Sequence, residues 1–358
     1  MSFGISSLIV PSVHEMVKEK ITTLPDRYIR TSSTCNLNHE DHDSHSSAKY
    51  TMPIINIECL LSGDPTLADS ELQKLDSACK DWGFFQVVNH GISSSLIEKL
   101  KSEVHNLFEL QLEEKKKLWQ KPGDQEGYGH QFVVSDDQKL DWYDMFLIAT
   151  LPTRIRKAHL FAAISLPLRE ALEAYSLGLK KLTMILLGQM CKALKMDSNE
   201  MIDLFNDCSQ RMRLSYYPPC PKPEQVLGAS PHSDACALTI LLQINGTDGL
   251  QIRKDGKWLL VKPLLDAFIV NVGDMIEILS NGVYCSIEHR VVIHPTKERI
   301  SIATFHSTNL DAEIGPALSL IDPYHRPALF RRETSQKYFQ NYFSHKEDGK
   351  SNLDYMRI

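Results

Sequence analysis

Three residues in the C-terminal half of the chain have side chains suited to binding a transition metal. His232 and Asp234 lie two positions apart, and His289 follows 57 residues after His232. Residues two apart on a strand share a face, so His232 and Asp234 can reach one ion, with His289 arriving from a later strand. Singly, each has an ordinary structural explanation as a core histidine or a turn aspartate. Together they favour a site for non-haem Fe(II), which two imidazoles and one carboxylate bind while leaving other positions open for reactants.

A cation and a hydroxyl follow at the same strand spacing. Arg299 and Ser301 alternate with Ile300 and Ile302, which predicts a partly buried strand. The planar arginine fork binds a carboxylate through two parallel hydrogen bonds, so a buried guanidinium needs an anion. That anion is either a protein carboxylate or an organic acid. The nearby metal motif favours the organic acid, used as a second reductant by an oxygenase.

An upstream segment has a polar face of the same kind. Arg211, Arg213, Ser215 and Tyr217 alternate with apolar or aromatic residues. Strand geometry places the four on one face. We therefore expect this face to line the same cavity as the metal and Arg299.

Composition narrows the classes of partner. The 358 residues carry a formal charge of −6, which argues against nucleic acid or an anionic membrane as the main partner. No apolar run approaches the roughly 20 residues of a membrane span, and the first 20 residues lack a signal-peptide core. The eight cysteines include no C-x-x-C pair, which favours reduced thiols. We expect a cytoplasmic monomer that binds a small-molecule substrate.

Patterning divides the chain into four regions. Residues 1–52 are expected to form an N-terminal arm and a flexible linker. The polar stretch 31–49 contains His39, His42 and His45, for which a solvated loop is favoured over a metal-binding tract. A mixed α/β region is expected over 53–206, a β-rich core over 207–310 and a helical extension over 311–358.

Periodicity predicts the elements within these regions. Helices are expected at 70–80, at 96–107, after Pro167 to about 186, and at 329–343, the last packing outside the β core. Strands are expected at 54–57, 84–88, 211–217, 238–244, 249–253, 258–262, 267–272, 275–279, 285–293 and 299–306. Asp255-Gly256 predicts a hairpin between two of them. The expected fold is α+β, with a double-stranded β-helix (jelly-roll) core flanked by helices and an N-terminal mixed region.

An ordered set of motifs resembles a known family. The chain is similar over nearly its whole length to plant 2-oxoglutarate/Fe(II)-dependent dioxygenases, nearest the benzylisoquinoline-alkaloid O-demethylases and senescence-related dioxygenases. The matching segments are 81–91 (DWGFFQVVNHG), 140–142 (LDW), 216–221 (YYPPCP), 232–234 (HSD), 271–274 (NVGD), 280–282 (SNG), 289–290 (HR), 299–301 (RIS) and 353–358 (LDYMRI).

The resemblance implies roles for individual residues. It assigns His232, Asp234 and His289 to iron, and Arg299 and Ser301, with help from Tyr217, to the distal carboxylate of 2-oxoglutarate. Two positions depart from the family pattern. Ser215 replaces a common asparagine, and the small residues 235–237 (ACA) predict a larger substrate space.

The resemblance also implies the reaction. Iron, 2-oxoglutarate and O2 would hydroxylate or oxidatively O-demethylate a hydrophobic plant specialised metabolite, alkaloid-like by overall similarity, with ascorbate as reductant. Desaturation or ring closure on a terpenoid or phenylpropanoid is the alternative, and a non-catalytic small-molecule-binding homologue is a further one. Tyr128, Tyr143, Arg213 and Phe305 are candidate substrate contacts, each with a core-packing alternative.

Overall fold

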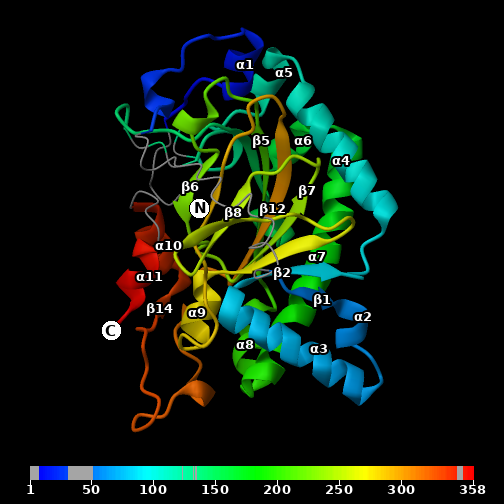
Figure 1. Ribbon diagram of the computed structural model, residues 1–358, viewed down its shortest axis with the longest axis vertical. Helices are drawn as coiled ribbons and strands as arrows, with labels where there is room; N and C mark the ends of the chain where they lie inside the picture. The colour runs from blue at the N-terminus through cyan, green and yellow to red at the C-terminus, as the bar shows by residue number, and fades with distance from the viewer. Residues whose placement is uncertain (1–7, 31–50, 123, 132, 134, 345–349) are drawn as a thin grey trace.

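Two β-sheets form the centre of the molecule (Figure 1). The computed structural model describes residues 8–30, 51–122, 124–131, 133, 135–344 and 350–358. The larger sheet has the order β1 (Ile54–Asn56), β2 (Phe84–Val88), β10 (Phe268–Val272), β7 (Leu238–Gln243), β12 (Arg299–Ser307), β5 (Ser209–Tyr217), β4 (Asp144–Leu151) and β3 (Gly127–Gly129). The smaller sheet has the order β6 (Ala229–His232), β11 (His289–Val291), β8 (Leu250–Lys254) and β9 (Lys257–Leu260). The predicted double-stranded β-helix core with flanking helices is confirmed.

The two faces of the larger sheet have different neighbours because side chains alternate along each strand. Met212, Leu214 and Ile302 belong to the core that includes helices α4 (Ser94–Glu109) and α7 (Leu166–Leu194). The intervening residues point to the opposite face, where Tyr217 packs with residues of the smaller sheet such as Leu250. The polar side chains predicted to share a face therefore lie between the two sheets.

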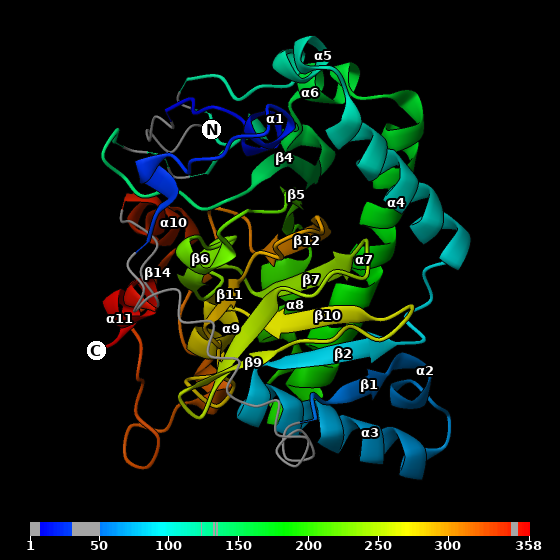
Figure 2. The ribbon, with the colours of Figure 1, turned by 45° about the horizontal axis from the view of Figure 1, so that its top comes forward.

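The other helices surround this centre. In Figures 1 and 2, α4 and α7 lie on one side of the molecule, and the C-terminal helices lie on the other. The remaining helices are α1 (Val13–Lys18), α2 (Ile57–Leu60), α3 (Pro65–Ser77), α5 (Leu112–Lys117), α6 (Ala158–Ala163), α8 (Ser198–Phe205), α9 (Asp274–Leu279), α10 (Ser335–Ser344) and α11 (Ser351–Met356). A short ladder joins β13 (Glu313–Ile314) to β14 (Glu333–Thr334).

A buried carboxylate attaches the described N-terminal segment to the larger sheet. Asp144, at the start of β4, accepts hydrogen bonds from the backbone amides of Val13 at 2.8 Å and His14 at 3.1 Å. The hydroxyls of Ser12 and Tyr128 also donate to Asp144. The first backbone amides of a helix have no acceptor within the helix and favour one with negative charge. Asp144 therefore caps α1 from a strand that is distant in sequence.

One predicted strand is wrong. Residues 275–279 were expected to be extended, but they lie in helix α9, in which every residue is buried. A short apolar run buried all round carries no periodicity that separates a strand from a helix. Two further segments are shorter than predicted: only His289–Val291 of the segment 285–293 pairs as a strand, and the helix expected at 329–343 begins at Ser335.

Strands β3, β4 and β6 were not predicted. All eight residues of β4 are buried, so its sequence shows no alternation between apolar and polar residues. Strand β6 is only four residues long and includes Pro231. All three strands are recognisable only from their partners in the sheets.

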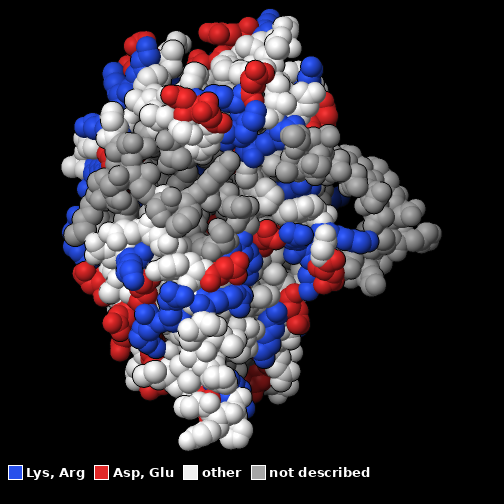
Figure 3. Space-filling model, turned by 90° about the vertical axis from the view of Figure 1, so that its left-hand side faces the viewer, with Lys and Arg blue, Asp and Glu red and all other residues white. Residues whose placement is uncertain are grey.

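Some expectations concern residues outside the described ranges. The linker 31–49, with His39, His42 and His45, is one of these. Among the described residues, no helix combines the length and apolar character needed to cross a bilayer. On the side of the molecule that carries α10 and α11, the described basic and acidic side chains are interspersed (Figure 3).

Candidate metal and carboxylate site

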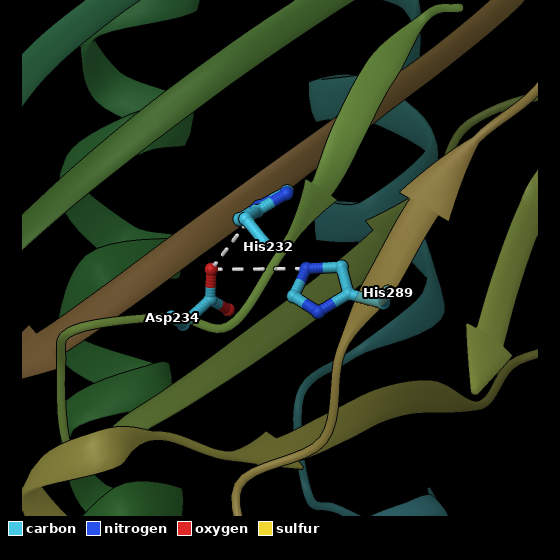
Figure 4. Close-up of side chains that lie close together, drawn as sticks. All are labelled: His232, Asp234 and His289. Atoms are coloured by element: carbon cyan, nitrogen blue, oxygen red, sulfur yellow. Dashed lines mark ion pairs between the residues drawn. The ribbon is translucent and has the colours of Figure 1, made fainter. Parts of the chain in front are cut away.

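The structure brings the three predicted metal ligands together (Figure 4). His232 ends β6 and pairs directly with His289, which begins β11. Asp234 lies in the loop just beyond β6, rather than on the strand itself as the spacing suggested. Its Oδ1 atom is 3.6 Å from Nε2 of His232 and 3.7 Å from Nε2 of His289. The three buried side chains thus offer two nitrogens and one oxygen to a single point.

Backbone contacts orient both imidazoles. Nδ1 of His232 lies 2.7 Å from the carbonyl oxygen of Ser230, and Nδ1 of His289 lies 3.3 Å from that of Ile287. A carbonyl only accepts, so each Nδ1 carries the proton and each Nε2 presents its lone pair. Burial, together with the neighbouring His232, lowers the pKa of His289 to about 4. His289 is therefore neutral at neutral pH, as a metal ligand must be.

The larger sheet orients Asp234. Thr239 on β7 and Asn271 on β10 donate to its Oδ2 atom at 2.5 and 2.8 Å. Oδ2 is thereby occupied, and Oδ1 is left for the metal. Burial alone would raise the pKa of Asp234, but the adjacent His289 and His232 hold it well below its usual range. The carboxylate is ionised and has one oxygen directed at the imidazoles.

The Thr239 contact predicts a measurable effect on metal binding. Thr239→Val keeps the size of the side chain but removes the hydroxyl that holds Oδ2. We expect Fe(II) affinity to fall by about 10-fold, within the roughly 10- to 100-fold range for loss of a partner of a metal ligand. Anaerobic Fe(II) titration measures the effect, and Thr296→Val on an exposed loop is the matched control. Equal affinities of wild type and Thr239→Val would show that Thr239 does not orient the ligand.

Arg299 lies on the larger sheet and faces the smaller one. Its Nη1 donates to Ser301 and its Nη2 to Gln243, both at 3.2 Å, and its guanidinium lies 5.3 Å from the ring centre of Tyr217. Burial lowers the pKa of Arg299, while hydrogen bonding to Tyr217 acts in the opposite direction. No carboxylate among the described residues forms an ion pair with it, although Asp248 attracts it electrostatically, and its buried Nε has no hydrogen-bond partner. The salt-bridge alternative is absent from the described structure, and the cluster suits the carboxylate of a small acid.

A glycine makes room for this cluster. A Cβ on Gly249 would lie 2.8 Å from the carbonyl oxygen of Val292 and 3.0 Å from Cδ of Arg299. Any side chain there would displace either the backbone or the arginine. Gly249 thus allows β8 to approach the stem of Arg299 closely.

A cavity of about 80 Å³ reaches His232 and Asp234. Its walls include Phe305 of β12 and three aromatic residues of α10, Phe339, Tyr342 and Phe343. Helix α10 was expected to pack outside the β core, and it also supplies part of the cavity wall. The hydroxyl of Tyr338 donates to the carbonyl of Ala235 at 3.0 Å, which ties α10 to the loop that carries Asp234.

The candidate substrate residues lie in three places, and only two of the four line the cavity. Arg213 and Phe305 line the cavity, and the guanidinium of Arg213 lies 5.5 Å from the Phe305 ring. Tyr143 lies near the Arg299 cluster, with its ring 6.0 Å from that of Tyr217. Tyr128 is not part of the cavity wall: it is buried beneath α1, where its hydroxyl contacts Asp144. Its position is that of a residue that stabilises the N-terminal segment.

Several residues of the site were not assigned a role from the sequence. Thr239 and Gln243 lie on an apolar strand where nothing distinguishes them from ordinary polar positions. Asn271 belongs to a recognised motif, but its contact with Asp234 depends on the pairing of β10 with β7. Ala235 and Cys236 do line the cavity, while Ser215 is buried opposite Ser301.

Comparison with known proteins identifies the family to which the chain belongs. The family model described as the 2OG-Fe(II) oxygenase superfamily matches residues 208–308, and that described as non-haem dioxygenase in morphine synthesis N-terminal matches 52–163. The chain belongs to the 2OG-Fe(II) oxygenase superfamily. It is a 2-oxoglutarate-dependent dioxygenase, and the His-Asp-His cluster and the buried Arg299 fit iron and 2-oxoglutarate.

Individual relatives are similar over the full length. The chain is 51% identical to Protein SRG1 of Arabidopsis thaliana, covering 99% of this chain and 98% of the relative. It is 48% identical to codeine O-demethylase of Papaver somniferum, covering 99% of this chain and 97% of the relative. It is 47% identical to oxoglutarate-dependent flavonoid 7-O-demethylase 1 of Ocimum basilicum, covering 98% of this chain and 92% of the relative. The crystal structure of JOX2 in complex with 2OG, Fe and JA superposes with a TM-score of 0.86 at 33% identity, covering 98% of each chain.

Proposed function

We propose that this dioxygenase hydroxylates or oxidatively O-demethylates a hydrophobic plant specialised metabolite. One observation carries the proposal: the aromatic cavity reaches the metal ligands His232 and Asp234 directly. A bound ring system would therefore present its substituents to the iron. Two relatives are named as O-demethylases of different scaffolds, codeine and a flavonoid. The reaction that the two relatives share supports demethylation more strongly than it supports one scaffold. Similarity to codeine O-demethylase favours an alkaloid-like substrate.

The chain's own residues bind and orient the reactants in this proposal. When bound, Fe(II) with 2-oxoglutarate and O2 supplies an oxidant that breaks a substrate C–H bond. His232, Asp234 and His289 would hold the iron, and Arg299 with Ser301 and Tyr217 would hold the distal carboxylate of 2-oxoglutarate. The buried surroundings exclude water, which strengthens the pairing of Arg299 with its anion.

The reaction balances without a further co-substrate. One oxygen atom of O2 enters succinate as 2-oxoglutarate loses CO2, and the other enters the substrate C–H bond. On an O-methyl carbon the product breaks down to formaldehyde and a free hydroxyl. The protein's contribution is to choose which C–H bond lies nearest the metal.

A coupled product assay tests the proposal. Purified enzyme with Fe(II), ascorbate and 2-oxoglutarate is incubated with O-methylated alkaloids and flavonoids, and succinate and formaldehyde are measured. We expect equimolar succinate and formaldehyde with at least one substrate. Succinate accompanied by a new double bond or ring would instead support desaturation or ring closure. If no compound stimulated succinate formation and 2-oxoglutarate gave no visible charge-transfer band with Fe(II) under anaerobic conditions, the enzyme proposal would fail.

We further propose a cytoplasmic monomer built from the four regions described above. The mixed charge of the face in Figure 3 is consistent with a protein that binds a small molecule and not nucleic acid. Size-exclusion chromatography with light scattering tests the monomer.

A further inference from the structure

Two arginines project from β5 into the cavity. Arg211 and Arg213 both line its wall, as expected for residues two apart on a strand. Asp234 is the only carboxylate among the described residues that line the cavity. Because Asp234 would be committed to the metal, no other carboxylate of the described cavity wall is left to balance the charge of Arg211.

Arg211 has fewer described contacts than Arg213, which contacts Gln131 and Phe305. Within the described part of the chain, the guanidinium of Arg211 forms neither an ion pair nor a side-chain hydrogen bond. Glu126 attracts it electrostatically but is engaged elsewhere: its Oε2 atom accepts from the amide of Ala149 at 2.8 Å, and its Oε1 atom lies 4.0 Å from Nζ of Lys157. A partly buried cation without a partner is costly, which points to a ligand that completes the site.

The position of Arg211 separates it from the 2-oxoglutarate site. Arg299 pairs with Tyr217 in the ladder between β12 and β5, whereas Arg211 pairs with Phe305. Six residues along a strand correspond to about 20 Å. Arg211 therefore lies at the far end of the cavity face from Arg299, beside the aromatic wall. The anion that it would bind is a different one from the distal carboxylate of 2-oxoglutarate.

We infer that the substrate of this enzyme is an aromatic acid whose carboxylate pairs with Arg211 while its ring packs against Phe305 and the aromatic residues of α10. The fork of arginine matches a carboxylate in two parallel hydrogen bonds. A protonated amine of the same shape would meet two cations and a metal ion and would be rejected. The inference rests on the proposed function and narrows the substrate class of the same cavity. Overall similarity favours an alkaloid-like substrate, whereas the charge of the cavity favours a ring system that carries a carboxylate over one that carries a protonated amine.

Matched ligands test the charge preference. The probes are 3-(4-methoxyphenyl)propanoate, its methyl ester and 3-(4-methoxyphenyl)propylamine, which share a ring and chain but differ in charge. Binding is measured by calorimetry under anaerobic conditions on enzyme loaded with Fe(II) and 2-oxoglutarate. We expect the acid to bind at least about 10-fold more tightly than the amine, the ratio that one charge-assisted hydrogen bond provides. Equal or tighter binding of the amine would overturn the inference.

Variants of Arg211 locate the preference. Arg211→Gln should weaken binding of the acid about 10-fold and leave the ester unchanged, whereas Arg211→Lys should retain part of the preference because it keeps the charge. Arg326→Gln, at an exposed position outside the cavity, is the matched control and should change nothing. If Arg211→Gln weakened all three ligands equally, Arg211 would be a structural residue and the inference would be wrong.

A separate measurement distinguishes failure of the Arg211 inference from failure of the proposed dioxygenase function. Succinate formation from 2-oxoglutarate without substrate, measured in the same preparations, reports on the iron and 2-oxoglutarate site alone. If the wild-type enzyme showed no preference for the acid while that activity was intact, only the inference would be refuted. Absence of that activity in wild type, together with absence of the charge-transfer band, would refute the proposed function instead.

Discussion

Asp234→Asn is expected to abolish turnover. The substitution preserves the size of the side chain and can preserve the contacts with Thr239 and Asn271, but it removes the only negative charge among the metal ligands. Loss of a ligand charge should cost more than the roughly 10- to 100-fold attributed to partners of a ligand, so we expect Fe(II) affinity to fall by more than about 100-fold. The anaerobic Fe(II)/2-oxoglutarate charge-transfer band should disappear at metal concentrations that saturate wild type.

The control for Asp234→Asn is the same substitution at a solvent-exposed aspartate. Asp311→Asn removes a carboxylate charge at an exposed position distant in sequence from the site and should leave the band and turnover unchanged. Circular dichroism checks that both variants are folded. A folded Asp234→Asn enzyme that binds Fe(II) with wild-type affinity would remove Asp234 from the metal site.

Arg299→Gln should produce the second largest effect, a loss of 2-oxoglutarate affinity by about 100- to 10,000-fold. Two charge-assisted hydrogen bonds contribute roughly 1.5–3 kcal/mol each, and every 1.4 kcal/mol corresponds to a factor of ten. Arg299→Lys should lose less, because it keeps the charge but not the fork. Calorimetry with 2-oxoglutarate on the metal-loaded protein measures all three affinities.

The stability of the ligand-free protein provides a separate check on Arg299. Arg299 is 3% exposed and has no ionic partner among the described residues, so its replacement removes a costly buried charge. We therefore expect Arg299→Gln to have an unfolding temperature no lower than that of wild type. Its stabilisation by added 2-oxoglutarate should be lost, since stabilisation depends on ligand concentration relative to Kd. A strong loss of stability without ligand would indicate a structural role for Arg299 and contradict its assignment to 2-oxoglutarate.

Much of the site was predictable from local spacing. His232, Asp234, Arg299 and Ser301 have residue types with few chemical uses, placed at the two-residue repeat of a strand. A strand's periodicity is a local property of its backbone, so the shared polar face of β5 and the alternation of β12 could be deduced without knowing the pairing. The predicted ligand set, the predicted carboxylate-binding arginine and the jelly-roll core followed from these patterns and the family resemblance.

Tertiary structure decided which distant residues complete the site. Thr239 and Asn271 orient Asp234 only because β7 and β10 are neighbours, and Gln243 reaches Arg299 only because β7 pairs with β12. Helix α10 joins the cavity wall because it packs against a loop about 100 residues earlier in the chain, where Tyr338 donates to the carbonyl of Ala235. Tyr128 was a plausible cavity residue by type, but the packing of α1 onto β4 directs it to Asp144.

The difference between what the sequence predicted and what the tertiary structure decided has a physical origin. Side-chain type and backbone repeat act over a few residues and are therefore properties of the sequence itself. They determined the predicted metal ligands, the predicted anion-binding arginine and most strands of this protein. Burial, sheet neighbours and the partners of charged groups depend on contacts between segments tens to hundreds of residues apart. Only the folded chain could therefore show that Arg211 faces the cavity without a counter-ion among the described residues, or that the buried run 275–279 is a helix.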